Sequence, residues 1–136
     1  ILNREHLARK LRTELRGYPR QGDFSGFDPN SGARLAWHPL GTLFHVLSGN
    51  VFLVGAGSLA IGAITGNTNI LKMSSGETAF LPRLLETLAE IDRDGVLSRS
   101  NELVEFSSAS TEVKSAFQQS VDGILVWGGE EAVRAY

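Results

Sequence analysis

Polar groups that could bind a ligand follow apolar segments at three places in the sequence. Asn50 follows the expected strand 42–47, Lys72 lies at the end of the expected strand 68–73, and Gly128-Gly129 follow a third apolar segment. An amide, an ammonium group and the backbone N–H groups of glycines can all bind carbonyl or phosphate oxygens. Strand, helix and strand with glycines at the crossings is the order in which α/β proteins build nucleotide sites. The pattern therefore predicts a nucleotide site.

The segment Gly55-Ala56-Gly57-Ser58-Leu59-Ala60 has two interpretations. As a Gly-x-Gly-x-x-Ala fingerprint after a strand at 51–54, it would bring the backbone close to a pyrophosphate, and Lys72 would suit a 2′-phosphate. As a run of small residues, it would let a helix pack closely against a sheet. We prefer the second interpretation, because a single fingerprint is weak evidence.

The spacing of apolar residues predicts helices that alternate with strands, which indicates an α/β fold with a mainly parallel sheet of about five strands. Asn3, Thr78 and Ser110 are expected N-caps, and Gly66-Asn67 an expected helix end. The expected elements are a helix at 4–16, a loop or a hairpin-like excursion at 18–33, a short strand at 34–37, a strand at 42–47, a buried helix or a strand leading into a helix at 51–65, a strand at 68–73, a helix from 78 to about 92, a strand at 103–106, a short helix after Ser110 or a neighbour with Val113, Ala116 and Phe117 inward, a strand at 123–127 and the start of a helix at 130–134.

Composition excludes several classes of function. The formal net charge of −2 predicts no strong attraction to nucleic acid or anionic membranes. The chain has no cysteine, and its three histidines have no spacing typical of a zinc site. The longest apolar run, 51–64, is too short for a membrane span, and no secretory signal opens the chain, so we expect a cytoplasmic protein. Because the sequence starts without Met and stops within an expected helix, we also expect a fragment.

Several motifs in order resemble the N-terminal part of the aldehyde dehydrogenase superfamily. They are Pro39-Leu40-Gly41, Asn50, Gly66-Asn67-Thr68, Lys72 and Val126-Trp127-Gly128-Gly129. His45, Ser48-Gly49-Asn50-Val51, Lys72-Met73-Ser74-Ser75 and Trp127-Gly128-Gly129 are similar to the acyl-CoA reductases of LuxC type within that superfamily. That family reduces fatty acyl thioesters to aldehydes with NADPH, and its best-known member supplies aldehyde to a luciferase in bioluminescence.

The resemblance implies a Rossmann-like sheet with flanking helices and assigns roles to individual residues. Asn50 would donate its amide to the thioester oxygen as negative charge develops there. Lys72 would bind the adenosine ribose or a 2′-phosphate. The resemblance also implies an N-terminal helix and loop at 1–33 and a partial NAD(P)-binding domain at 34–136.

The residues after Lys72 bear on the choice of cofactor. Ser75 stands where many superfamily members have a ribose-binding Glu, so Ser74 and Ser75 would leave room for a 2′-phosphate and favour NADPH over NADH, although Glu77 is close in sequence. Gly128 and Gly129 would open the helix whose N-terminus faces the pyrophosphate. The two glutamates that follow suit the helix dipole but not a phosphate directly beside them.

The chain lacks two parts of the family's machinery. The nucleophilic cysteine and the general base would lie outside it, so this chain alone would be inactive, while the full-length protein would take acyl-CoA or another acyl thioester and form a homo-oligomer. Two alternatives stay open: an NAD(P)-dependent aldehyde dehydrogenase that oxidises aldehydes, and a nucleotide-binding module without catalysis. His45 lies within an apolar strand, where a core residue with satisfied hydrogen bonds is the preferred interpretation over a catalytic one.

Overall fold

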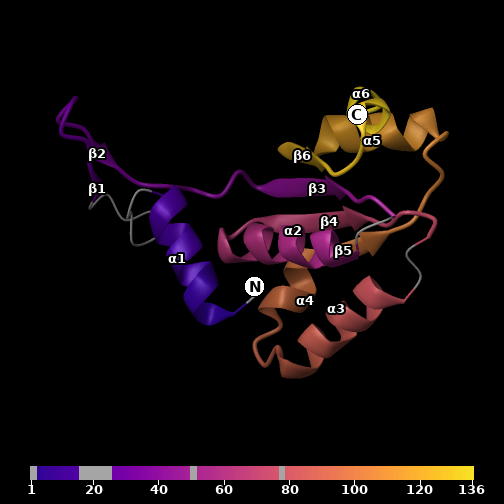
Figure 1. Cartoon of the computed structure of the whole chain (residues 1–136), viewed down its shortest axis with the longest axis horizontal. Coiled ribbons are helices and arrows are strands. Elements are labelled where there is room, and N and C mark those ends of the chain that lie inside the picture. Colours follow the sequence, from indigo (N-terminus) through magenta and orange to yellow (C-terminus); the bar gives the residue numbers. More distant parts are fainter. Residues whose placement is uncertain (1–2, 16–25, 50–51, 77–78) are drawn as a thin grey trace.

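The computed structural model describes residues 3–15, 26–49, 52–76 and 79–136. Helices and strands alternate through most of this part of the chain (Figure 1). The helices are α1 (Arg4–Glu14), α2 (Phe52–Ile64), α3 (Phe80–Ile91), α4 (Val96–Ser100), α5 (Thr111–Ser120) and α6 (Glu130–Arg134). The strands are β1 (Gly26–Phe27), β2 (Arg34–Leu35), β3 (Thr42–Val46), β4 (Thr68–Lys72), β5 (Asn101–Val104) and β6 (Gly123–Val126).

The main sheet has four strands in the order β5-β4-β3-β6, and all of its pairs are parallel. Counted along the chain, this order is 3-2-1-4, which is that of the first four strands of the doubly wound dinucleotide-binding sheet. The predicted Rossmann-like α/β fold is therefore confirmed, with four strands in the described part of the sheet rather than about five. The short strands β1 and β2 form a separate antiparallel pair.

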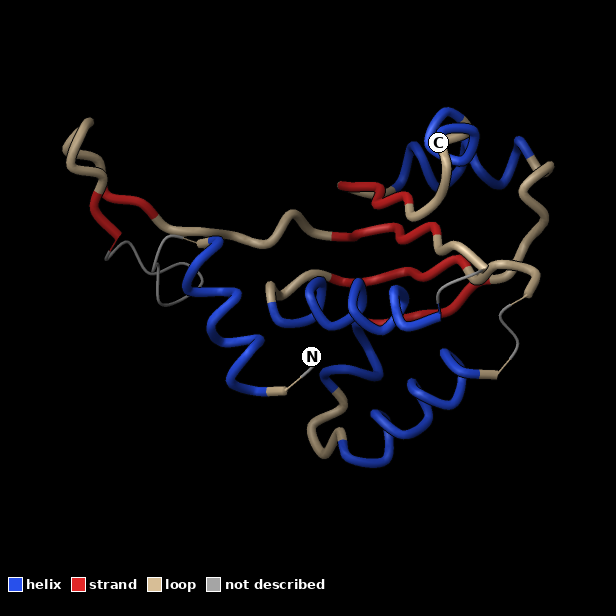
Figure 2. The backbone as a smooth tube through the Cα atoms, in the orientation of Figure 1, coloured by secondary structure: helices blue, strands red, loops and turns tan. Residues whose placement is uncertain are grey.

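Helices cover both faces of the sheet, with α2, α3 and α4 on one side and α5 and α6 on the other (Figures 1 and 2). Successive side chains of a strand point to opposite faces. His45 accordingly contacts Ser58 on α2, whereas its neighbour Phe44 stacks on Phe117 of α5. Each face thus has its own core.

The core on the α2 side is aliphatic, and the core on the α5 side is aromatic. The buried aliphatic residues are Leu47, Leu59, Leu71 and Leu81, with Met73, Phe80, Leu84, Leu85, Leu88 and Leu103 packed against them. On the opposite face the ring of Phe44 is fully buried and lies 4.4 Å from the ring of Phe117, centroid to centroid, and Phe106 stacks beside both. These two cores hold the strands in register.

Helix α2 corrects one interpretation of the glycine-rich segment. Since the helix begins at Phe52, Gly55 and Gly57 lie inside it rather than in a turn after a strand at 51–54. A Cβ at Gly55 would meet Leu47 and Leu81 at 3.0 Å, whereas a Cβ at Gly57 would meet nothing within 4 Å. The interpretation as close packing is confirmed at Gly55 and not at Gly57. Gly62, outside the predicted run, also packs closely, because a Cβ there would overlap the side chain of Asn69. The helix ends where Gly66 takes a φ of 78°, as the Gly66-Asn67 pair predicts.

Other local predictions have mixed outcomes. Asn3 caps α1 by accepting from the backbone N–H of His6, as predicted. Ser110 stands at the predicted N-cap position of α5, but its side chain makes no capping hydrogen bond. The strand expected at 103–106 instead runs over Asn101–Val104. Ala116 is exposed rather than inward.

Two more differences concern helices. Helix α4 was not among the expected elements, and the N-cap of α3 is Ala79, while Thr78 lies outside the described residues. In the described part of the chain, no helix combines the length and the apolar composition that a membrane crossing needs.

Candidate functional site

The described residues predicted to bind the cofactor lie at, or directly after, the carboxyl ends of strands: Lys72, Ser74 and Ser75 at the end of β4, and Gly128 and Gly129 after β6. The register pairs Val46 with both Lys72 and Val126, and Lys72 with Val104, so the four strands end together. After β3 the chain adds β4 and then β5 on one side of β3, and it later adds β6 on the other side of β3. In open α/β sheets, ligands bind at the carboxyl edge where the strand order reverses in this way. Asn50 follows β3, but it lies outside the described residues.

Lys72 is a buried cation at this edge. Only 5% of its surface is exposed. Its Nζ lies 3.5 Å from the backbone oxygen of Met73, 3.4 Å from Ser108 Oγ and 5.0 Å from the centre of the Phe106 ring. Among the described residues, no carboxylate lies within 4.0 Å of Nζ. A buried charge is costly unless it is paired, so this ammonium group is suited to an anionic partner.

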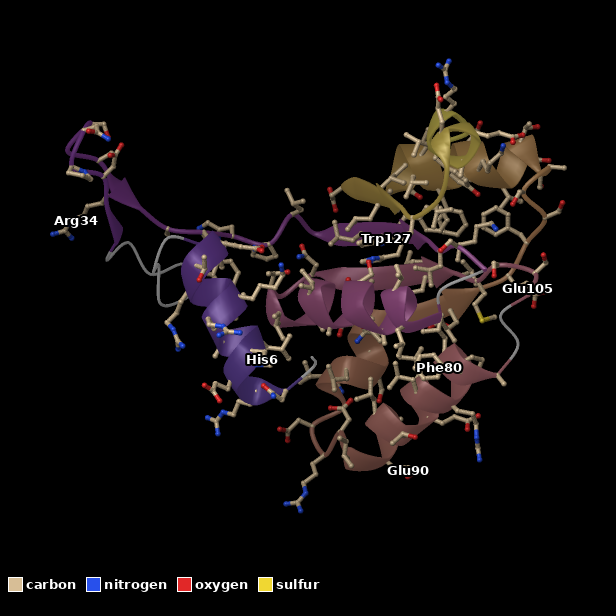
Figure 3. All side chains as sticks on the ribbon, in the orientation of Figure 1. His6, Arg34, Phe80, Glu90, Glu105 and Trp127 are labelled. Atoms are coloured by element: carbon tan, nitrogen blue, oxygen red, sulfur yellow. The ribbon has the colours of Figure 1, made fainter. Side chains whose placement is uncertain are left out.

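Burial and nearby charges shift the pKa of Lys72 in both directions. Burial lowers the pKa of Lys72, Glu105 raises it, and the positive charge of Lys114 lowers it further. Lys114 lies on α5, with its Nζ 5.6 Å from the centre of the Tyr136 ring. Two cations from different elements thus face the same region, and an anion placed there would interact with both. Figure 3 labels Glu105 at this end of the sheet.

Ser74 and Ser75 differ in their surroundings. Ser74 Oγ is buried and has no hydrogen-bond partner among the described residues. It packs against Gly49, where a Cβ would come within 2.8 Å of the hydroxyl oxygen, so the two segments after β3 and β4 touch. Ser75 is exposed. A buried hydroxyl without a partner next to Lys72 fits a second polar group of a ligand.

Gly128 and Gly129 form the turn after β6. Both are exposed, and Gly129 is the N-cap residue of α6, as predicted. Helix α6 has five residues, and Glu130 in its first turn pairs with Arg134. This short helix contributes little dipole, so a phosphate near the turn would depend on individual backbone N–H groups and on Lys72.

A chain of polar side chains, buried except for Trp127, runs across the sheet beneath the carboxyl ends of its strands. Trp127 Nε1 donates to Ser58 Oγ at a distance of 3.0 Å. The same Ser58 oxygen lies 2.6 Å from His45 Nδ1, and His45 Nε2 lies 3.0 Å from Asn69 Oδ1. Asn69 Nδ2 donates to Asn67 O and Asn101 Oδ1, so Asn69 Oδ1 is left to accept. His45 is therefore neutral with its proton on Nε2, and Ser58 donates to Nδ1. The prediction of a core histidine with satisfied hydrogen bonds is confirmed.

His45 predicts a pH dependence of stability. Burial lowers the pKa of His45 from its ordinary 6.5, although the hydrogen bond with Asn69 opposes this. Below pH 6.5 the unfolded chain therefore binds a proton more readily than the folded chain. We expect the free energy of unfolding to be highest above pH 6.5 and to fall as the pH drops toward the lowered folded-state pKa.

The measurement is the urea midpoint at a series of pH values, with the His45→Asn variant as a control for the other titrating groups. The wild-type protein should lose more stability than the variant between about pH 7 and about pH 5. Parallel curves for the two proteins would show that His45 is not the group responsible.

A cleft of about 770 Å³ lies along the α2 face of the molecule. Its lining combines apolar residues of α2 and β6 with polar residues of α1. Ser58 and Trp127 belong to this lining, so their hydrogen bond forms part of the wall of the cleft. His6, which Figure 3 labels on α1, lines the same cleft.

Sequence reasoning missed two sets of residues. One set lies near Lys72 and consists of Phe106, Ser108 and Lys114. Because the strand was expected to extend through Phe106, these residues were not recognised as following the end of β5. Asn69 and Asn101 were missed because a single polar residue in a strand forms no motif. The signal that could have found them is that each occupies an inward-facing position of a buried strand, where a polar side chain needs a hydrogen-bond partner.

Comparison with known proteins identifies the family. A family model described as "Acyl-CoA reductase (LuxC)" matches residues 1–136. The chain is 30% identical over 96 residues to the "Long-chain acyl-protein thioester reductase" of Vibrio harveyi and 31% identical over 96 residues to that of Photorhabdus laumondii subsp. laumondii. These matches cover 70% of the chain, which spans only about 20% of the length of either relative. The chain therefore belongs to the LuxC family of acyl-CoA reductases.

Proposed function

We propose that the protein to which this chain belongs reduces long-chain fatty acyl thioesters to aldehydes with NADPH. The observation that carries the proposal is the buried ammonium group of Lys72, which has no carboxylate partner among the described residues and lies at the carboxyl edge of a dinucleotide-type sheet. The names of the curated relatives support the thioester substrate. When bound, NADPH would supply a hydride to the acyl carbon, the displaced thiolate would take up one proton from solvent, and aldehyde, thiol and NADP⁺ would be the products.

The described residues fit the phosphorylated end of this cofactor. Lys72 would pair with the 2′-phosphate or bind the ribose, and the unpartnered hydroxyl of Ser74 would donate to an oxygen of the same group. Ser75 is exposed and places no carboxylate at the position where many superfamily members have a ribose-binding Glu. The backbone N–H groups of Gly128 and Gly129 would bind the pyrophosphate, on the other side of β3.

The remaining roles belong to the acyl group. In this proposal Asn50, between the two cofactor contacts in the strand order, donates its amide to the thioester oxygen and stabilises developing negative charge. Because the chain has no cysteine, the nucleophile that forms the acyl-cysteine intermediate comes from outside it. The described residues therefore supply cofactor contacts, and the bond-breaking chemistry requires the rest of the gene product.

Lys114 should contribute to the preference for NADPH. Its charge lowers the pKa of Lys72, so an anion bound at Lys72 would also be attracted by Lys114. We expect Lys114→Gln to weaken NADPH binding about threefold to tenfold and to leave NADH binding nearly unchanged, because NADH lacks the 2′-phosphate. Calorimetric titration with both cofactors measures this difference, and Lys10→Gln on exposed α1 is the matched control. Equal losses for both cofactors would exclude this role.

The direct test of function uses the product of the complete gene with a long-chain acyl-CoA or an acyl-protein thioester. We expect oxidation of NADPH to match the aldehyde and the free thiol formed, one for one. An aldehyde dehydrogenase working in the oxidative direction would instead oxidise aldehyde without CoA, and a nucleotide-binding module would bind NADPH with no turnover. Either of these results would replace the proposed function with the corresponding alternative.

A further inference from the structure

The exposed turn after β6 is tied to the interior of the sheet through one indole group. Trp127 is 43% exposed, yet its Nε1 donates to Ser58 Oγ, which is buried and in turn bonded to His45. We propose that Ser58 and His45 are positioning residues that hold the turn Trp127-Gly128-Gly129 in the conformation that binds the pyrophosphate of the cofactor. This inference rests on the NADPH site proposed above.

Within the turn, only Trp127 has a side chain that reaches the interior of the sheet. Gly128 and Gly129 are exposed; Gly129 O accepts from the backbone N–H of Val133 at 3.2 Å, and Gly128 lies against Ala132, so both contacts are with α6 and not with the sheet. Glycine has the widest conformational freedom of all residues, so a pair of glycines costs the most entropy to order. Trp127 is anchored twice, by its backbone N–H to Val46 O at 2.8 Å and by its indole to Ser58. Fixing the residue before the glycines lowers the entropy cost when a ligand binds them.

The sequence of α2 supports a specific role for Ser58. In the thirteen residues of Phe52–Ile64, Ser58 has the only polar side chain. A buried hydroxyl gains nothing over an apolar side chain unless its hydrogen bonds are made. Ser58 makes two of them, one to His45 and one to Trp127, and the second reaches out of the core to the candidate cofactor edge.

The direction of the hydrogen bonds makes His45 part of the same hydrogen-bond network as Ser58 and Trp127. In the neutral ring the single N–H is on Nε2 and donates to Asn69 Oδ1, so Nδ1 accepts from the Ser58 hydroxyl. The lone pairs of Ser58 Oγ are then directed to other donors, of which Trp127 Nε1 is one. Removing the His45 ring frees the hydroxyl to rotate, so Trp127 would lose a fixed acceptor.

The test is a double-mutant cycle in the product of the complete gene. Ser58→Ala and Trp127→Phe each remove one end of the same hydrogen bond, and Trp127→Phe keeps an aromatic ring at a partly exposed site. We expect each variant to raise the Kd for NADPH about fivefold, and the double variant to bind no more weakly than the weaker single variant. In the cofactor-free protein, amide hydrogen exchange in residues 127–136 should be faster in both single variants. Thr65→Val, which removes a hydroxyl near the end of α2, should change neither quantity.

The outcomes separate this inference from the proposed function. If the wild-type protein binds no NADPH, the proposed function fails and this inference fails with it. If the wild-type protein binds NADPH and a folded Ser58→Ala variant binds it equally well, only the positioning role is overturned. Effects of Ser58→Ala and Trp127→Phe that multiply in the double variant would overturn it too, because independent effects mean that no shared hydrogen bond is involved. If Ser58→Ala does not fold, Trp127→Phe alone decides, and unchanged binding by it contradicts the proposal.

Discussion

Replacing Lys72 with methionine is expected to weaken NADPH binding about 10- to 100-fold, because the variant loses a charge-assisted contact with the 2′-phosphate. Methionine keeps the length of the side chain and suits the contact with Phe106. Since Lys72 is buried and has no carboxylate partner among the described residues, the thermal midpoint of the cofactor-free protein should be unchanged or higher. Calorimetric titration and thermal unfolding of the same samples measure the two effects.

The combination of weaker binding with an unchanged or higher thermal midpoint makes the prediction specific. Replacing a lysine that only stabilised the fold would lower the thermal midpoint, whereas replacing a ligand-binding lysine would weaken binding without lowering the midpoint. Lys10→Met provides the control, because Lys10 is an exposed lysine of α1 that pairs with Glu14. Unchanged NADPH binding by a folded Lys72→Met variant would exclude Lys72 from the cofactor site.

Truncating Phe44 to alanine is expected to cost about 3 to 5 kcal/mol in the free energy of unfolding. The ring is fully buried on β3, at the centre of the aromatic core on the α5 face. Its loss would leave Phe106 and Phe117 stacked around a void. Because Phe106 also contacts the ammonium group of Lys72, the same variant should weaken NADPH binding. Urea unfolding followed by a binding titration measures both.

Two companion variants check that the cost comes from lost packing. Phe44→Leu keeps most of the volume and should lose much less stability. Leu53→Ala truncates a side chain that is 61% exposed and should change the unfolding free energy by less than about 0.5 kcal/mol. A cost below about 1 kcal/mol for Phe44→Ala would mean that the aromatic stack contributes little to the fold.

The fold was largely predictable because its elements carry local signals. Short apolar segments next to turn residues mark β3 and β4, and Gly66 with Asn67 marks the end of α2. The order of the strands could not be predicted, because it depends on contacts that are distant in the sequence. The conformation of 51–65 could not be predicted either, because an apolar run fits a helix or a strand equally well. The structure resolves that segment as a helix packed through Gly55 and Gly62.

The candidate site was predictable only in part. Lys72 and the glycines at 128–129 could be found because each follows a recognisable strand and matches a family motif. Ser108 and Lys114 could not be connected with Lys72, since their sequence separations of 36 and 42 residues carry no local signal and the end of β5 was expected two residues later. The bond between Ser58 and Trp127 spans 69 residues, and it depends on how α2 lies over the sheet.

Amide hydrogen exchange with and without NADPH, on the product of the complete gene, would locate the cofactor on the sheet. We expect NADPH to slow exchange in the segments that follow β3, β4 and β6, around Gly49, Ser74 and Gly128, and to slow it less in the Lys72→Met variant. Protection confined to the opposite end of the sheet, or none at saturating NADPH, would contradict the assignment of the carboxyl edge as the cofactor site.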